Sequence, residues 1–406
     1  MQTIDNVRVW GEPEEKALVQ AKVCSAYGDV AGVALMADHH QGYSQPIGGV
    51  VAYRNQISPS GVGYDIACGN KAVKTGIYAW QIENDLSRIM DEIQSQISFG
   101  VGRKNSKPVD NALFDSDAWN VYKSIGTQEH DRLKALAREQ LGTVGSGNHY
   151  IDLFEEADDG ELWIGVHFGS RGFGHKTASG FLNLANGREF SGKAPGEKID
   201  QPPTLIDVNS ELGDMYITAM NLAGQYAYAG RDYVVEQVLN ILGTESVFSV
   251  HNHHNFAWKE HHNGEDVWVV RKGATPSAPG QLGFVGGSMC DIAVIVEGID
   301  SEENRLSYNS TVHGAGRVMS RTQAAGKMNW KTRTRLGGQI TPEQMHEAVK
   351  AYGVELRGAG TDESPFVYRK LKDVLDAHAN TVKVKHILKP IGVCMAGGDE
   401  FDPYKD

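Results

Sequence analysis

The chain has 406 residues, of which 51 are acidic and 39 are basic, and its formal net charge is −12. This balance excludes a protein with a uniformly positive surface, so a nucleic-acid site would have to be a local basic patch. The sequence contains no run of about 18 apolar residues, the length of a membrane-spanning helix. Its first residues lack the basic and apolar segments of a secretory signal, so we expect a cytoplasmic protein. The 4 cysteines are far apart and form no CxxC pair, which argues against a disulfide framework or a zinc ribbon.

Hydrophobic periodicity predicts helices and strands that interleave along the chain. Helical spacing of apolar residues is clearest in segments 13–23, 80–97, 129–141, 211–242, 342–352 and 365–377. Short apolar runs predict strands at 33–36, 48–52, 163–167, 246–251, 267–270, 292–296 and 381–388. Because the interleaving lacks strict βαβ spacing, we expect a mixed α/β (α+β) fold, one large domain over residues 1–406 with several sheets and surrounding helices. Several predicted strands end in glycine- and histidine-rich segments, which places the expected active site on loops at strand ends.

Segment 61–70 reads GVGYDIACGN and places Asp65 and Cys68 three residues apart in a glycine-flanked turn. A carboxylate and a thiolate at this spacing can converge on one pair of metal ions, and the thiolate can bridge them. Such a ligand set suits Mn²⁺ or Zn²⁺ better than Mg²⁺. The alternative is a buried free cysteine beside a turn-forming aspartate.

Two further glycine-rich segments carry candidate ligands. LGTVGSGNHYID ends in Asn148, His149 and Asp152, and its glycines allow the backbone to approach a ligand closely. His149 alone could equally be an ordinary surface or core side chain. VHFGSRGFGH places His167 at the end of a predicted strand and Arg171 in a loop. That loop could offer backbone N–H groups and a guanidinium to a phosphate.

The segment SVHNHHNF contains three histidines in four residues. If the strand predicted before it continues, neighbouring side chains point to opposite faces. His251 and His253 would then share one face, while Asn252 and His254 would share the other. We therefore expect His253 and His254 not to bind the same metal ion.

The segment STVHGAGRVMSR contains a candidate nucleophile, His313, followed by the small residues Gly314, Ala315 and Gly316. A histidine nucleophile must expose one imidazole nitrogen to an incoming phosphorus, and small neighbours leave room for a nucleotide. Arg317 could neutralise charge on the phosphoryl oxygens. The alternative is a glycine-rich turn with an incidental histidine.

A basic segment surrounds this motif, because no acidic residue occurs between Glu303 and Glu343. A phosphate-backbone ligand would be drawn to it, and Trp330 could stack on a base. The alternative is a solvated basic face that serves only solubility. The basic side chains are Arg305, Arg317, Arg321, Lys327, Lys331, Arg333 and Arg335.

Taken together, these segments resemble the RtcB family of RNA-splicing ligases, in order and over nearly the whole chain. Each motif alone is weak, but eight or more in the right order make a specific pattern, and HGAGR with GYDIxCG is close to diagnostic. The motifs are DHHQG (38–42), GVGYDIACGN, GTVGSGNHYID, HFGSRGFG, HHNF, RKGAT (271–275), GGSM (286–289), HGAGRVMSR and DESPFVYRKL (362–371).

The resemblance implies a GTP- and Mn²⁺-dependent ligase of one RtcB-like domain. Such enzymes join an RNA end with a 2′,3′-cyclic phosphate or 3′-phosphate to a 5′-hydroxyl end, through a guanylylated histidine that corresponds to His313. A helper protein such as an archease could be a further partner. The two-metal centre maps onto Asp65, Cys68, His149, His167 and His254, with Cys68 as the bridge. Nucleotide contacts map onto Asn148, Asp152, Asn255, Ser288 and Tyr368, beside the small residues Gly314, Ala315 and Gly316.

Two positions depart from the family pattern. Asp152 stands where relatives usually have glutamate, so its reach toward a guanine edge is shorter. Met395 stands where relatives commonly have a lysine that approaches the nucleotide, and a thioether supplies no cation. Two other functions remain alternatives: a binuclear metal-dependent phosphoesterase, and an RNA-end-binding homologue that has lost turnover. A phosphoesterase has no need of a histidine such as His313 in a small-residue cradle.

Overall fold

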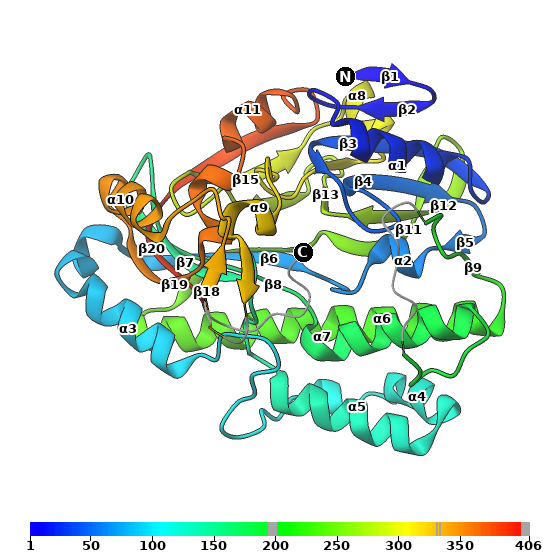
Figure 1. Ribbon diagram of the computed structural model, residues 1–406, viewed down its shortest axis with the longest axis horizontal. Helices are drawn as coiled ribbons and strands as arrows, with labels where there is room; N and C mark the ends of the chain where they lie inside the picture. The colour runs from blue at the N-terminus through cyan, green and yellow to red at the C-terminus, as the bar shows by residue number, and fades with distance from the viewer. Residues whose placement is uncertain (194–200, 330–331, 333, 399–406) are drawn as a thin grey trace.

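The computed structural model describes residues 1–193, 201–329, 332 and 334–398. Most of its strands belong to two sheets, and helices pack against both of them (Figure 1). This architecture confirms the mixed α/β class. Within the described residues, no helix combines the length and the apolar character needed to cross a bilayer.

The six-stranded sheet has the order β1-β2-β3-β4-β12-β11, and only β2 and β3 run parallel. The helix α1 (Glu15–Ser25) packs against β3 and β4. It begins where the Glu14 carboxylate accepts hydrogen bonds from the N–H groups of Lys16 and Ala17. The strands are β1 (Gln2–Ile4), β2 (Val7–Val9), β3 (Val30–His40), β4 (Ile47–Tyr53), β12 (Glu265–Lys272) and β11 (Asn255–His262).

The eight-stranded sheet follows the order β10-β6-β8-β7-β20-β15-β14, with β19 paired to β20. The long strand β20 pairs with β15 through its first part and with β7 through its second, so residues near the end of the described chain lie beside β7. The strands are β10 (Ser246–His253), β6 (Gly69–Tyr78), β8 (Glu161–Phe168), β7 (Tyr150–Glu156), β20 (Val382–Gly397), β15 (Ala293–Gly298), β14 (Leu282–Val285) and β19 (Glu355–Ala359).

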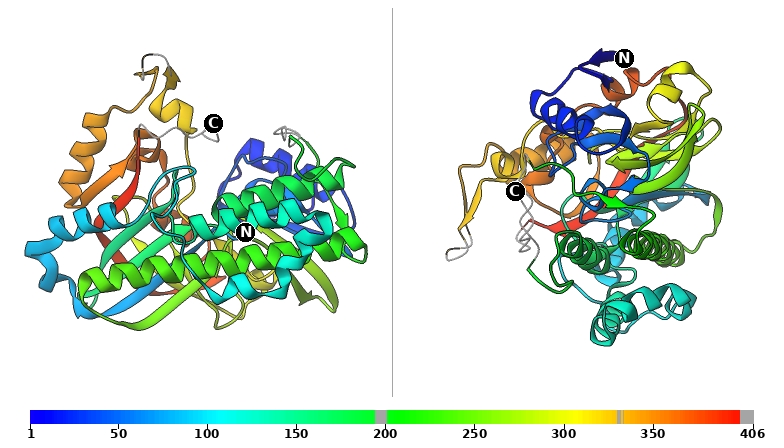
Figure 2. Two further views of the ribbon diagram at one scale, coloured as in Figure 1. Left: turned by 90° about the horizontal axis from the view of Figure 1, so that it is seen from below. Right: turned by 90° about the vertical axis from the view of Figure 1, so that its right-hand side faces the viewer.

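The helix α7 (Glu211–Leu242) spans 32 residues and packs against β6 and β8. The Ser210 hydroxyl caps its first turn, and Gly243, in the left-handed conformation, ends it. One face buries side chains such as Tyr216 and Met220, each worth about 1.5–3 kcal/mol when removed from water. Figures 1 and 2 show α6 beside α7 and α5 outside them. The buried face of α7 thus supports the strands that carry the site.

Shorter elements complete the described chain. The hairpin β17–β18 stands out from the body of the molecule (Figure 2). The paired strands are β13 (Ala274–Pro276) with β16 (Ser310–Val312), β17 (Lys327–Asn329) with β18 (Thr334–Leu336), and β5 (Gln56–Ile57) with β9 (Ile206–Asp207). The other α-helices are α2 (Pro59–Val62), α3 (Leu86–Gln96), α4 (Asn120–Ile125), α5 (Thr127–Gln140), α6 (Arg171–Ala185), α8 (Glu302–Leu306), α9 (Arg321–Ala325), α10 (Pro342–Tyr352) and α11 (Leu371–Asp376).

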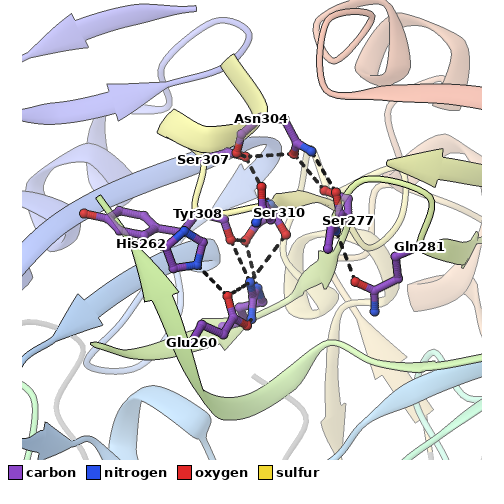
Figure 3. A network of polar contacts seen from close by, with 11 residues as sticks. Glu260, His262, Ser277, Gln281, Asn304, Ser307, Tyr308 and Ser310 are labelled. Atoms are coloured by element: carbon purple, nitrogen blue, oxygen red, sulfur yellow. Dashed lines mark hydrogen bonds and ion pairs between the residues drawn. The ribbon is translucent and has the colours of Figure 1, made fainter. Parts of the chain in front are cut away.

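A buried polar network, which we call the Arg271 network, joins β11 and β12 to the segment from α8 to β16 (Figure 3). The Arg271 guanidinium donates to both Glu260 oxygens, at 2.6 and 3.0 Å, and to Ser310 Oγ at 2.8 Å. His262 Nε2 lies 2.7 Å from Glu260 Oε2. The Asn304 amide donates to two backbone carbonyls, each at 2.8 Å. These contacts fix the strand that precedes His313.

Three of the predicted elements need correction. Segment 365–377 is not one helix: a 3₁₀ turn, Pro365–Val367, is followed by extended backbone at Tyr368 and then by α11. Segment 80–97 is a 3₁₀ helix, Ala79–Asp85, followed by α3. The expected loop at Arg171 is instead the first residue of α6, because a buried face that includes Phe173 stabilises the helix despite its glycines.

Candidate functional site

A cavity of about 750 Å³ brings together every site residue that the family resemblance implies. Its volume lies in the usual range for a ligand pocket. Its lining includes Asp65, Cys68, Asn148, His149, Asp152, His167, His254, Asn255, Ser288, His313, Gly314, Ala315, Gly316, Arg317 and Tyr368. Arg171 is not among the residues that line it, but its Nη1 lies 3.2 Å from His149 Nδ1.

Strand register explains why the candidate metal ligands meet. Cys68 directly precedes β6, His149 directly precedes β7, and His167 is the second-last residue of β8. These strands are neighbours and antiparallel, so the start of β6 and the start of β7 lie beside the end of β8. His254 joins them, because the end of β10 pairs with the start of β6. Four of the five candidate ligands therefore lie at or next to strand ends, as expected, and Asp65 lies in the loop before β6.

Two groups of side chains in the cavity could each hold a metal ion, and both contain Cys68. One group adds His167 and His254, and the other adds Asp65 and His149. The Cys68 Sγ lies 3.4 Å from His167 Nε2 and 3.7 Å from His149 Nε2. His149 Nε2 lies 3.1 Å from Asp65 Oδ2. One sulfur, three imidazoles and one carboxylate form a donor set that suits a pair of divalent transition-metal ions.

Protonation states in this cluster also suit metal binding. Burial lowers the pKa of His167 and of His254 well below the usual value, so both imidazoles are neutral and carry a lone pair. Burial would raise the pKa of the Asp65 carboxyl, but the hydrogen bond and charge of His149 lower it to about 2. Burial and the charge of Asp65 raise the pKa of the Cys68 thiol. The negative charge of Asp65 disfavours a thiolate at Cys68, and a bound cation would offset this repulsion.

The orientation of two imidazoles is visible in their contacts. His149 Nδ1 lies 2.9 Å from the Val144 carbonyl, which leaves Nε2 facing Cys68 and Asp65. His254 Nδ1 is buried and has no hydrogen-bond partner among the described residues. A buried nitrogen without a partner is costly unless a ligand satisfies it. Both observations fit a site built for metal ions.

His313 follows β16 and lies beside His254, with their ring centroids 4.9 Å apart. Its Nδ1 lies 2.6 Å from Oδ2 of Asp38, a side chain with no exposed area. The same oxygen accepts from the N–H groups of His313, at 2.9 Å, and Gly314, at 3.2 Å. Burial would raise the pKa of Asp38, but the charge and hydrogen bonds of His313 hold it below the usual value. An ionised Asp38 favours the tautomer with hydrogen on Nδ1, so Nε2 keeps its lone pair.

The sequence did not identify Asp38 as a functional residue, although it begins the DHHQG motif. Its partner His313 is 275 residues away along the chain, and only the fold brings them together. Space around His313 depends on Gly273, which has a φ of +62° and whose absent Cβ would lie 3.0 Å from the His313 ring. Gly169 has a similar role beside Asp65, where a Cβ would lie 2.1 Å from the carboxylate.

One part of the cavity, which we call the Asp152 slot, is lined by Tyr150 and Asp152 of β7 and by Val393 and Met395 of β20. Asp152 pairs with Val393 and Tyr150 pairs with Met395, so these side chains share one face of the sheet. The Tyr150 hydroxyl and Asp152 Oδ1 are buried without a partner among the described residues. Burial raises the pKa of Asp152 well above its usual value. The slot therefore offers hydrogen-bonding groups beside apolar side chains, a combination that suits a heterocyclic base.

Two other residues expected to contact the nucleotide, Asn255 and Ser288, also form hydrogen bonds within the protein. Asn255 Oδ1 accepts from the Gly273 N–H at 2.7 Å, and its Nδ2 donates to the Asp65 carbonyl at 3.3 Å. Ser288 Oγ accepts from the Cys290 N–H at 3.4 Å. Asn255 thus links two sides of the cavity, in addition to lining it.

The basic segment is partly neutralised, which corrects the expectation from the sequence. Arg321 forms ion pairs with Asp362 and Glu363, and Arg317 Nη1 lies 3.4 Å from Glu363. Arg317 Nη1 also donates to the Tyr368 hydroxyl at 3.1 Å, so both line the cavity as a bonded pair. The acids come from a distant part of the sequence, which local charge counting does not include. Arg305 pairs with Asp300, while Trp330, Lys331 and Arg333 lie outside the described residues.

The histidine motif is arranged as expected. β10 extends to His253, and both His251 and His253 contact Arg231 on α7, so they share one face. Asn252 points the other way, where its Oδ1 accepts from the Phe284 N–H at 3.0 Å. Only His254 joins the metal-capable groups in the cavity. The prediction that His253 and His254 point to different places is confirmed.

The fold and cavity define a mixed α/β protein whose site combines metal-capable side chains with a histidine oriented by a carboxylate. Residues 20–396 match the family model described as tRNA-splicing ligase RtcB. The chain belongs to the RtcB family.

The chain is also similar to curated RtcB proteins over most of their length. The chain is 31% identical to the RNA-splicing ligase RtcB of Escherichia coli over 389 residues, which cover 90% of each chain. It is 29% identical to the tRNA-splicing ligase RtcB of Pyrobaculum aerophilum, covering 88% of this chain and 86% of that one. It is 28% identical to the tRNA-splicing ligase RtcB of Thermococcus kodakarensis, with the same coverage.

Proposed function

We propose that this protein is a GTP- and Mn²⁺-dependent RNA ligase that joins 3′-phosphate or 2′,3′-cyclic phosphate ends to 5′-hydroxyl ends. The observation that carries the proposal is the position of His313, oriented by Asp38 at 2.6 Å and adjacent to the metal-capable cluster. Family membership and relatives named RNA-splicing ligases support the reaction class. The substrates would be GTP and two RNA ends, in a cytoplasmic setting, with an archease as a candidate helper.

The first step forms a phosphoramidate. His313 Nε2 attacks the α-phosphorus of GTP, a P–N bond forms, and the P–O bond to pyrophosphate breaks. Asp38 Oδ2, 2.6 Å from Nδ1, stabilises the positive charge that develops on the imidazole. Asp65, Cys68, His149, His167 and His254 would hold two Mn²⁺, which would neutralise phosphate oxygens during the transfers.

Two further transfers complete ligation. An oxygen of the RNA 3′-phosphate attacks the guanylyl phosphorus, and the P–N bond to His313 breaks. The 5′-hydroxyl of the second RNA then attacks the 3′-phosphate, loses its proton, and GMP leaves. A 2′,3′-cyclic end is first opened by water to a 3′-phosphate in the same cavity. Arg317 and the small residues Gly314–Gly316 would border the phosphates, and the Asp152 slot would receive the guanine.

A metal-dependent phosphoesterase is the second candidate, because the same cluster would activate water. The pairing of His313 with Asp38 favours the ligase. A hydrolase needs no imidazole nitrogen held ready outside the metal ligands, whereas a guanylyl acceptor does.

Incubation with labelled GTP and Mn²⁺, followed by denaturing electrophoresis, tests the proposal. We expect a covalent label that survives alkali and is lost in acid, as a histidine phosphoramidate should be. The His313→Ala variant should show no label but should still bind metal. A label that persists in this variant, or a wild-type chain that binds metal but never becomes labelled, would reject the ligase mechanism.

A further inference from the structure

Arg231 is a buried cation on α7 whose acceptors are two backbone carbonyls and two imidazoles rather than a carboxylate. Its side chain has no exposed area. Burial lowers its pKa to about 10, so the guanidinium remains charged at neutral pH. A buried charge is expensive unless every donor is used, and such a group is retained where its contacts serve a purpose.

Two of the contacts fix the backbone beside metal-capable side chains. Arg231 Nη1 donates to the carbonyl of Ala67 at 3.1 Å and to the carbonyl of Phe168 at 2.5 Å. Ala67 directly precedes Cys68, and Phe168 directly follows His167. Ala67 has a φ of 60°, a left-handed conformation that a residue with a Cβ seldom adopts. The bond to its carbonyl helps to hold this turn.

The other two contacts reach the histidine motif. Arg231 Nε donates to His251 Nε2 at 2.8 Å, and its Nη2 lies 2.8 Å from His253 Nδ1. The Tyr228 ring stacks on His253 with centroids 3.9 Å apart, which further restricts that imidazole. His253 directly precedes His254, whose N–H donates to the Cys68 carbonyl at 2.8 Å.

We propose that Arg231 is the positioning residue of the metal centre, whose single guanidinium sets the relative positions of Cys68, His167 and His254. It contacts the chain next to each of the three, which come from different strands and together form one of the metal-capable groups. The inference rests on the metal centre of the proposed function. Arg231 neither lines the cavity nor belongs to a metal-capable group, so it acts through these neighbours.

The rigid planar fork of arginine is needed for this role, because its donors point in fixed directions toward several acceptors. A lysine carries the same charge on one nitrogen and cannot reach two carbonyls and two imidazoles from opposite sides. The Arg231→Lys variant therefore separates the fork from the charge.

The test is a titration of the full-length protein with Co²⁺ alone. Calorimetry measures the affinity, and the cobalt–thiolate charge-transfer absorption reports the bond to sulfur. We expect Arg231→Lys to weaken Co²⁺ affinity about 10- to 100-fold and to shift or reduce the thiolate band. The matched control is Arg271→Lys, at another buried arginine, which lies in the Arg271 network and does not line the cavity. It should lose stability while its Co²⁺ affinity and spectrum stay as in the wild type.

The outcomes distinguish this inference from the proposed function. Wild-type protein that binds no Co²⁺ would reject the metal centre itself. Wild type that binds, with a folded Arg231→Lys variant of equal affinity and identical spectrum, would overturn the positioning role alone.

Should Arg231→Lys fail to fold, His253→Phe provides a second variant, since it keeps a ring against Tyr228 but removes the acceptor for Arg231. A several-fold loss of Co²⁺ affinity with a shifted band would support the role, and unchanged binding would overturn it.

Discussion

Two buried polar regions lie close together in this protein and differ in how completely their atoms are paired. In the Arg271 network, the labelled side chains of Figure 3 have no buried unpartnered atom among the described residues. In the cavity, His254 Nδ1, the Tyr150 hydroxyl and Asp152 Oδ1 are buried and unpartnered within the same part of the chain.

The difference separates a network whose contacts serve the fold from cavity groups that a bound ligand could complete. A network in which every polar atom is paired adds rigidity. Removing one member leaves its partners buried without a hydrogen bond, which lowers stability. Buried polar groups without a partner destabilise the ligand-free protein. They are retained where a bound ligand supplies the missing hydrogen bond. Substitutions in the Arg271 network should therefore change stability, whereas those in the cavity should change binding and turnover.

The largest effect is expected for Cys68→Ala. Both metal-capable groups share this sulfur, so its loss should remove bound Mn²⁺ and reduce RNA ligation by more than about 100-fold. Elemental analysis of the dialysed protein and a ligation assay would measure this. Cys24→Ala, at a buried thiol whose Sγ contacts the Ser44 carbonyl, is the control and should keep metal and activity. Full metal content in Cys68→Ala would contradict the shared-sulfur centre.

Asp38→Asn should lower the rate of guanylylation by about 10²- to 10⁴-fold, because the amide can present N–H to Nδ1 and favour the wrong imidazole tautomer. Mn²⁺ affinity should stay unchanged, since Asp38 is outside both metal-capable groups. Single-turnover labelling with GTP and parallel calorimetry would separate the two quantities. An unchanged labelling rate would show that Asp38 does not orient His313.

Glu260→Gln should act on stability instead. Burial would raise the pKa of Glu260, but Arg271 and His262 lower it from 4.5 to about 2. A lowered carboxyl pKa stabilises the fold above about pH 4.5, and the gain is lost as the pH falls toward 2. The variant should lose about 3 kcal/mol of unfolding free energy at pH 7 and show a flatter acid limb. Urea unfolding at pH 7, 5 and 3 would measure both, and parallel curves for the two proteins would be the contrary result.

Met395→Lys should give the smallest effect, a several-fold tighter apparent affinity for GTP. The new cation would lie in the Asp152 slot, where Asp152 Oδ1 is buried without a hydrogen-bond partner among the described residues. Met395→Leu conserves volume without charge and should leave the affinity as it is. Equal GTP affinity for all three proteins would mean that another group already supplies this contact.

Local patterns predicted much of the fold. The helices at 211–242 and 342–352 have the bounds that the sequence predicts, because their caps and apolar periods agree. Alternation along β10 also predicted that His253 and His254 would not bind the same metal ion, and the family resemblance pointed to His254 as the ligand. Every site residue that the family resemblance implies lines the same cavity, whereas Arg171, considered for phosphate binding, does not.

Long-range pairing was not predictable in this way. The break at Tyr368 arises because its hydroxyl bonds to Glu363 and its backbone bridges Arg317, contacts that override helical periodicity. The pairing of Asp38 with His313, and of Arg231 with two carbonyls, depends on how distant strands assemble. Such contacts carry no local sequence signal.

Diffraction at the manganese absorption edge, from crystals grown with Mn²⁺ and GTP, tests the central claim most directly. We predict two anomalous peaks beside Cys68 Sγ, one bordered by His167 and His254 and the other by Asp65 and His149. Metal located only at the acidic group Glu156, Asp159 and Glu161, or a cavity without an anomalous peak, would contradict it.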